Sequence, residues 1–88
     1  LADQLNTTVE PNAYGPMFGI VHAHVDCGIS NIDWFENAPP ARGAEMGEEI
    51  GLLNPIRPVR GWVTPPKGPG WGAEWDWKRF KSKRVATL

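Results

Sequence analysis

Apolar side chains between residues 16 and 28 recur every three or four positions along the chain. This spacing matches the 3.6-residue period of a helix with one apolar face. Pro16 suits the first helical position, and Gly28 is placed to end the helix. The pattern therefore predicts a largely buried helix over 16–28, with its apolar positions at Met17, Phe18, Ile20, Val21, His24, Val25 and Cys27.

Two short runs that favour extended structure flank this helix. Thr7-Thr8-Val9-Glu10 is rich in β-branched residues and stops at Pro11, and Ile32-Asp33-Trp34-Phe35-Glu36 ends before Asn37-Ala38-Pro39-Pro40. Both are predicted to be strands. A strand, helix and strand with a crossover of this length form a parallel unit. Glu10 and Glu36 are then expected at the carboxyl ends of neighbouring strands.

The remaining segments carry weaker patterns. Residues 41–54 are polar and contain three glutamates, and we expect a loop there, with a weak helix as the alternative. Residues 56–60 and 62–64 on either side of Gly61 predict a short hairpin or two small extended pieces, and 75–83 predicts one or two helical turns. Residues 1–6 resemble the last turn of a helix, so the chain is expected to be part of a longer protein.

Composition points to a loop-rich chain with a small core. Ten glycines and nine prolines occur among 88 residues and concentrate in 38–72. A chain of this length buries only about 60 percent of its unfolded surface. The single cysteine, Cys27, cannot form an internal bridge, and no signal peptide or apolar run of about 18 residues is visible. We therefore expect a cytoplasmic protein without a membrane partner.

Charge is unevenly distributed along the chain despite a net value of −1. Residues 1–50 hold eight acidic residues and only Arg42 as a base, whereas 51–88 hold eight basic and two acidic residues. Such a split suits two faces packed together or contacts with other parts of a larger protein. The basic stretch 78–84 could bind nucleic acid. A solvated terminal stretch is the commoner explanation, so no nucleic-acid partner is predicted.

Glycine and proline alternate in 65–72, Pro-Pro-Lys-Gly-Pro-Gly-Trp-Gly. A phosphate-binding loop would require a following lysine and serine or threonine, which the sequence lacks. The prolines fix φ, and the glycines permit the positive φ of a tightly folded loop. This run is interpreted as turn structure.

The histidines and Cys27 give no sign of metal chemistry. His22 and His24 lie two positions apart on the predicted helix, so they point in different directions and do not converge on one ion. His24 is expected to be a buried helix residue satisfied by a hydrogen bond, and His22 a surface or interface residue. Cys27 is expected to be a small buried apolar group.

Five tryptophans are many for this length, and they occur at Trp34, Trp62, Trp71, Trp75 and Trp77. Their faces could stack on sugars or on proline-rich peptides, which is typical of a binding module. The favoured interpretation is that they hold a loop-rich segment on a neighbouring surface, because each can bury some 150–250 Å².

Two motifs in order resemble the C-terminal part of the enolase superfamily, of the mandelate racemase and muconate lactonizing type. His24 precedes Glu36 by twelve residues, as a helix histidine precedes a strand-end glutamate in that family. Gly61, a strand, the proline-glycine run 65–72 and Asp76 then follow in the family's order. The resemblance covers about residues 1–80.

The resemblance implies an α/β fold, namely the C-terminal fragment of a (β/α)7β TIM-like barrel. Residues 1–40 would form the end of the barrel, with strand 7, helix 7 and strand 8. Residues 41–88 would be a loop-rich segment associated with the capping domain. The remainder of the barrel and the capping domain would be partners, and the full enzyme would be a homo-oligomer.

The resemblance also implies the chemistry. Such enzymes remove the proton α to a carboxylate of a small-molecule substrate, with Mg²⁺ stabilising the enolate. Glu36 would be the strand-end glutamate that holds the substrate carboxylate or enolate oxygen. Many members carry a histidine where this chain has Glu10-Pro11-Asn12, so Glu10 is predicted as an alternative acid/base group or polar contact and Asn12 as substrate-binding. Ligands for Mg²⁺ are expected outside this segment.

Two functions therefore stand at this stage. The first is that the chain is part of a lyase or isomerase, namely a dehydratase or racemase that acts on hydroxy acids or acid sugars. This segment alone is not expected to be active. The second is a non-catalytic binding module rich in tryptophan and proline. Nothing in the sequence identifies the substrate.

Overall fold

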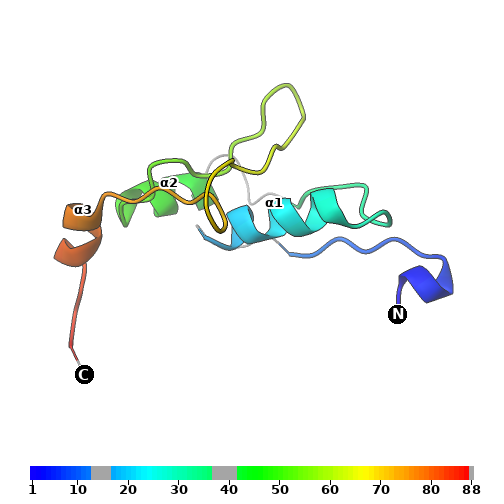
Figure 1. The fold of residues 1–88 in the computed structure, drawn as a ribbon, viewed down its shortest axis with the longest axis horizontal. Coiled ribbons are helices and arrows are strands. Elements are labelled where there is room, and N and C mark those ends of the chain that lie inside the picture. The colour runs from blue at the N-terminus through cyan, green and yellow to red at the C-terminus, as the bar shows by residue number, and fades with distance from the viewer. Residues whose placement is uncertain (13–16, 37–41, 88) are drawn as a thin grey trace.

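The computed structural model describes residues 1–12, 17–36 and 42–87. Four helical elements occur in these ranges: η1 (Asp3–Leu5), α1 (Phe18–Gly28), α2 (Arg42–Glu49) and α3 (Trp77–Ser82). Two isolated antiparallel bridges, Leu52 with Trp75 and Val59 with Trp62, are the only β pairing in the described residues. Figure 1 shows α1 and α2 along the middle of an elongated molecule, with α3 at one end.

The predicted barrel fragment is wrong. The segments 7–12 and 31–36 are extended, but the described part of the chain contains no sheet. One backbone hydrogen bond, from Val9 N to Asn31 O at 3.0 Å, joins these segments, and the Asn31 side chain donates to Thr7 O at 3.1 Å. A barrel requires a continuous ladder closed on itself, because each strand must pair on both sides. Here neither segment is paired along its length.

The helix predicted over 16–28 is confirmed from Phe18 onward, while Pro16 lies outside the described residues. Ile20 and Ala23 lie one turn apart and are fully buried. Of these two residues, only Ile20 is among the apolar positions from which the helix was predicted. Phe18 remains largely exposed, so the buried stripe is narrower than the pattern suggested.

The favoured loop over 41–54 is wrong in its first part, because α2 occupies Arg42–Glu49. Ala44 and Gly47, three positions apart, form the buried face of α2. Glu45 and Glu48 point to solvent. A stripe of only two small residues is a weak apolar signal, which explains why the helix was the less favoured alternative.

The segment after α2 packs against the segment that precedes α3. Leu52 is fully buried, and Leu53 N donates to Glu74 O at 2.8 Å. Asp76 N donates to Gly51 O at 2.8 Å. The side chain of Asp76 then caps α3 by accepting from Arg79 N at 3.0 Å. The one or two helical turns predicted for 75–83 are confirmed as α3.

The predicted hairpin around Gly61 is confirmed. Val59 and Trp62 exchange two backbone hydrogen bonds, of 2.8 and 3.0 Å. Arg60 and Gly61 between them have φ values of 53° and 82°. Positive φ at both central residues matches the two-residue turn whose twist suits a hairpin.

Arg57 and Glu48 form the one ion pair of the described residues, at 2.8 Å. Both side chains are about half exposed, so the pair stabilises the fold by about 1 kcal/mol at most. The acidic and basic halves of the sequence therefore do not meet in an extensive charged interface within the described part of the chain.

The molecule is more open than a compact protein of its mass. Its accessible surface is 6808 Å², whereas a compact 9.7 kDa protein exposes about 5,100 Å². Its radius of gyration is 14.7 Å, against about 12 Å for 88 residues in a compact domain. Ile20, Ala23, Ala44 and Leu52 make up the buried hydrophobic core of the described residues. This agrees with the small core expected from the length.

None of the helices in 1–12, 17–36 and 42–87 has the length and hydropathy needed to cross a bilayer.

Candidate functional site

Asn12 and Glu36, two of the predicted site residues, lie in contact. Asn12 Nδ2 donates to Glu36 Oε1 at 3.2 Å. The partners are 24 positions apart, as are Thr7 and Asn31, which meet at the other end of the same segments. The constant offset means that the two extended segments run in the same direction. They bring the two side chains together without a continuous ladder.

Glu10 occupies the same extended segment, two residues before Asn12. Alternate residues of an extended chain point to the same side, so its side chain leaves the segment on the Asn12 side. Glu10 is exposed, and no hydrogen bond joins it to Glu36 among the described residues. Its predicted acid/base role stays a prediction.

The Asn12–Glu36 pair has limited chemical options. The Glu36 carboxylate is exposed and accepts a hydrogen bond from the Asn12 amide. As a carboxylate it can accept a proton or a hydrogen bond, and as a carboxylic acid it can donate a hydrogen bond to an oxyanion.

The described residues do not fit a Mg²⁺ site. They contain no group of three or more histidine, cysteine, aspartate or glutamate side chains that could hold a metal ion. Mg²⁺ is held by one or more carboxylates with waters or substrate oxygens in octahedral geometry. We therefore assign no chemical step to a metal on these residues.

The two histidines of α1 serve packing. His24 Nε2 lies 3.1 Å from Trp71 O, and its ring meets the Trp71 ring edge to face at 5.6 Å. The hydrogen bond predicted for His24 is confirmed, but its predicted burial is wrong, because the side chain is only partly buried. The His22 ring lies 6.2 Å from that of Phe18. Cys27 is exposed, so its predicted burial is wrong.

The proline-glycine run has the predicted turn geometry. Gly68, Gly70 and Gly72 have φ values of 140°, 59° and 68°. A Cβ on Gly72 would lie 2.8 Å from Pro66 O, closer than real Cβ contacts allow. Glycine is therefore required at Gly72 for two reasons, its φ and the close approach of the backbone.

Four of the five tryptophans form two groups, and the fifth, Trp71, packs its ring on His24. Trp75 contacts Trp77 and Phe80, with ring centroids 6.1 and 5.2 Å apart, so these rings hold α3 on the preceding segment. Trp34 and Trp62 are instead 73% and 79% exposed. The interpretation of tryptophans as packing residues fits the first group and leaves the second group uncovered.

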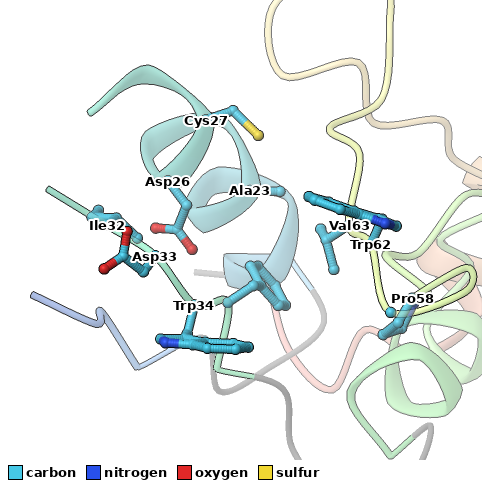
Figure 2. A pocket seen from close by; sticks show the side chains of 11 residues that line it. Ala23, Asp26, Cys27, Ile32, Asp33, Trp34, Pro58, Trp62 and Val63 are labelled. Carbon is cyan, nitrogen blue, oxygen red and sulfur yellow. The ribbon is translucent and has the colours of Figure 1, made fainter. Parts of the chain in front are cut away.

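The sequence interpretation missed a cavity of about 490 Å³ between α1, residues 32–35 and residues 58–63. Figure 2 shows the carboxylates of Asp26 and Asp33 on one side of this cavity and the Trp62 ring on the other. Trp34 lies along its edge. The available signal was Asp26 itself, an acid placed three positions after Ala23 on the buried side of the helix.

Asp26 is the electrostatically unusual group of this cavity. Both of its carboxylate oxygens are buried, and neither has a hydrogen-bond partner among the described residues. Burial raises the pKa of Asp26 above its ordinary value, and the charge of His22 opposes part of that rise. His22 Nδ1 is likewise buried without a partner in the described residues, so the two side chains do not satisfy each other.

Comparison with known proteins gives no match: no family model, no curated protein and no solved structure resembles this chain significantly.

Proposed function

We propose that this chain supplies part of the active site of an enzyme that removes the proton α to a carboxylate of a small-molecule substrate. The observation that carries the proposal is the hydrogen bond between Asn12 and Glu36 at the ends of two extended segments. The resemblance of the 24–36 and 61–76 motifs to mandelate racemase-like enzymes supports the same class of reaction. The proposal does not depend on a barrel.

Glu36 has the central role in this proposal. Proton removal from the α carbon leaves negative charge on the substrate carboxylate oxygens, and a hydrogen bond from a protonated Glu36 would stabilise that charge. Asn12 positions Glu36 through its amide. Glu10 supplies a second polar contact or an alternative acid/base group. The base that takes the α proton would come from other residues of the enzyme.

The resemblance to mandelate racemase-like enzymes implies that the proposed enzyme uses Mg²⁺. When bound, the ion would stabilise the enolate as a Lewis acid. Its ligands would be contributed by residues other than those described here. The products would be those of a dehydratase or racemase acting on a hydroxy acid or acid sugar. We include a cytoplasmic location and a homo-oligomeric full enzyme in the proposal.

Deuterium exchange tests the proposal in the complete enzyme. A panel of 2-hydroxy acids and sugar acids is incubated in D₂O, and NMR follows loss of the α proton. Glu36→Gln keeps the shape of the side chain but replaces the acidic O–H donor by a weaker amide N–H donor that cannot transfer a proton, and we expect exchange to fall by about 10²-fold. Glu45→Gln, on the exposed side of α2, is the matched control and should retain full exchange. A change within about threefold for Glu36→Gln would remove it from the site.

The exposed rings of Trp34 and Trp62 favour a second candidate, a non-catalytic binding module. Such a module should unfold cooperatively on its own and bind sugars or proline-rich peptides through those rings. A segment of an enzyme should need its remaining parts to fold. Thermal unfolding of the 88-residue chain separates the two, because a sharp transition of a monomer would favour the module.

A further inference from the structure

The cavity between α1 and the Val59–Trp62 hairpin is acidic, and His22, the basic side chain whose charge acts on Asp26, does not line it. Asp26 and Asp33 line it, and no lysine, arginine or histidine is among its described lining residues. A buried carboxylate without a partner is costly, since it loses water and gains nothing in return. The Asp26 oxygens are buried and unpaired in this way. The cavity therefore favours a ligand that brings a positive charge and several hydrogen-bond donors.

The other walls restrict the kind of cation. Trp34 and Trp62 border the cavity, and Ile32 and Val63 add apolar surface. Indole faces attract cations, and the attraction is strongest for groups that also stack. A metal ion would use the two carboxylates but would leave the indole faces and the apolar wall without a partner. A planar organic cation on an apolar stem satisfies the carboxylates, the rings and the apolar wall together.

We propose that this cavity is a binding site for a guanidinium group carried on an aliphatic stem. The planar guanidinium presents five N–H donors in a fork that matches a carboxylate, and it stacks on aromatic faces. Its donors pair with the exposed Asp33 carboxylate, and with Asp26 once that carboxylate turns into the cavity, while the stem lies along the apolar wall. Asp26 then adds a second negative charge near the same cation. This site is separate from Asn12 and Glu36, which do not line the cavity.

The volume is consistent with such a ligand. About 490 Å³ lies within the range of sites that enclose small molecules, and it leaves room for more than a guanidinium alone. The group could belong to a free small molecule or to an arginine side chain of another polypeptide. Both sources share the same chemistry.

NMR titration of the complete protein that contains this chain tests the proposal with n-butylguanidinium as the probe. We expect saturable shifts of the Trp34 and Trp62 indole N–H signals, with a Kd of about 1 mM or below. n-Butylurea has nearly the same shape without the charge and should bind at least tenfold more weakly. Equal binding of the urea would overturn the proposal, because the cavity would then recognise shape and apolarity alone. Absence of saturable shifts up to 50 mM probe, taken with an unchanged fold, would overturn it as well.

Variants locate the site. Asp26→Asn preserves the size of the side chain and removes its charge, and we expect it to weaken n-butylguanidinium binding at least tenfold. Asp3→Asn, an exposed aspartate of η1, is the matched control and should bind like the parent chain. Trp62→Leu keeps apolar bulk without the ring and should weaken binding severalfold, while Trp77→Leu in α3 should not. Parent-like binding by both Asp26→Asn and Trp62→Leu would place the probe elsewhere and overturn the proposal.

A short peptide with one internal arginine and blocked ends forms the second arm. Tighter binding of the peptide than of n-butylguanidinium supports a protein arginine as the natural occupant. Tighter binding of n-butylguanidinium supports a small molecule. Replacement of the arginine by citrulline, its neutral analogue, should abolish peptide binding, and unchanged binding of the citrulline peptide would contradict a charge-based site.

Discussion

The region before residue 37 and the region after residue 41 use different means to hold distant segments together. In the first, three side-chain or backbone hydrogen bonds join 7–12 to 31–36, and all of them lie at the surface. In the second, backbone bonds around Leu52, a bridge to Trp75 and a clamp by Asn54 join segments about 20 residues apart. The second region is therefore held more firmly, because turn-forming residues and the buried Leu52 side chain fix its loops. In the first region, residues that merely favour an extended backbone leave the two segments joined by few hydrogen bonds.

Substitution of the buried anchor is expected to have the largest effect. Leu52→Ala removes a fully buried side chain from a core of few residues, and should lower the free energy of unfolding by about 2–5 kcal/mol. Its neighbour Leu53 is 61% exposed, so Leu53→Ala should cost less than about 0.5 kcal/mol. Urea unfolding followed by tryptophan fluorescence measures both. Similar losses of unfolding free energy for the two variants would contradict the role of Leu52 as the buried anchor of the second region.

Substitution within the glycine turns comes next. Gly72→Ala strains a positive φ and also forces Cβ against Pro66 O, so we expect a loss of about 3 kcal/mol. Gly70→Ala has the same φ problem but open space around it, and should cost about 1–2 kcal/mol. Thermal or urea unfolding measures the loss of stability in each variant. The difference between the two losses is the cost of the clash between Cβ and Pro66 O. A larger loss at Gly70 would contradict this account of the loop.

A matched pair of asparagines compares the two regions directly. Asn54 donates to Gly72 O at 2.8 Å and accepts from Glu74 N at 2.9 Å, whereas Asn31 donates once, at the surface, to Thr7 O. Asn54→Ala should cost about 1–3 kcal/mol and Asn31→Ala less than about 1 kcal/mol.

Hydrogen exchange adds a local readout for the same pair of regions. The Leu53 amide bonds to Glu74 O and the Val9 amide to Asn31 O. We expect Leu53 to be protected more strongly than Val9, because its bond lies beside a buried anchor. Equal protection of the two amides would show that the first region is held as firmly as the second.

The smallest effect concerns pH and Asp26. Its folded-state pKa is raised above the ordinary value of 3.8, so between the two values the folded chain binds more protons than the unfolded chain. Stability should therefore fall as pH rises through this window, and the stabilisation present at lower pH is lost above the folded-state pKa. Asp26→Asn should remove this dependence, whereas Asp3→Asn should not. Urea midpoints from pH 3 to 7 test it, and a constant difference between parent and Asp26→Asn would contradict it.

Local features were predictable from the sequence because their causes lie within a few residues. The hairpin at Arg60–Gly61 and the positive φ of Gly72 follow from turn chemistry that no distant contact overrides. The spacing of apolar residues likewise predicted α1. In each case the residue types restrict the backbone directly.

Features that depend on distant contacts were not predictable to the same degree. The β-branched residues in 7–10 favour an extended backbone but do not determine whether it pairs with another strand. The prediction of a parallel sheet was therefore wrong. The α2 helix was disfavoured because Ala44 and Gly47 give little apolar signal before other segments cover them. The sequence predicted Glu10 and Glu36 at the ends of neighbouring segments but did not predict the hydrogen bond between Asn12 and Glu36. Asp26 was missed because an acid on a helix is ordinarily solvated.

The position of Asn54 in the sequence also affects its rate of deamidation. Deamidation of asparagine begins when the backbone nitrogen of the next residue attacks the side-chain carbonyl to form a cyclic imide. The next residue is Pro55, whose ring nitrogen carries no hydrogen and cannot complete that step. The amide that joins residue 54 to Gly72 and Glu74 is thus placed where spontaneous conversion to aspartate is blocked. An asparagine with two hydrogen bonds to the segment before α3 therefore occupies a position that resists deamidation.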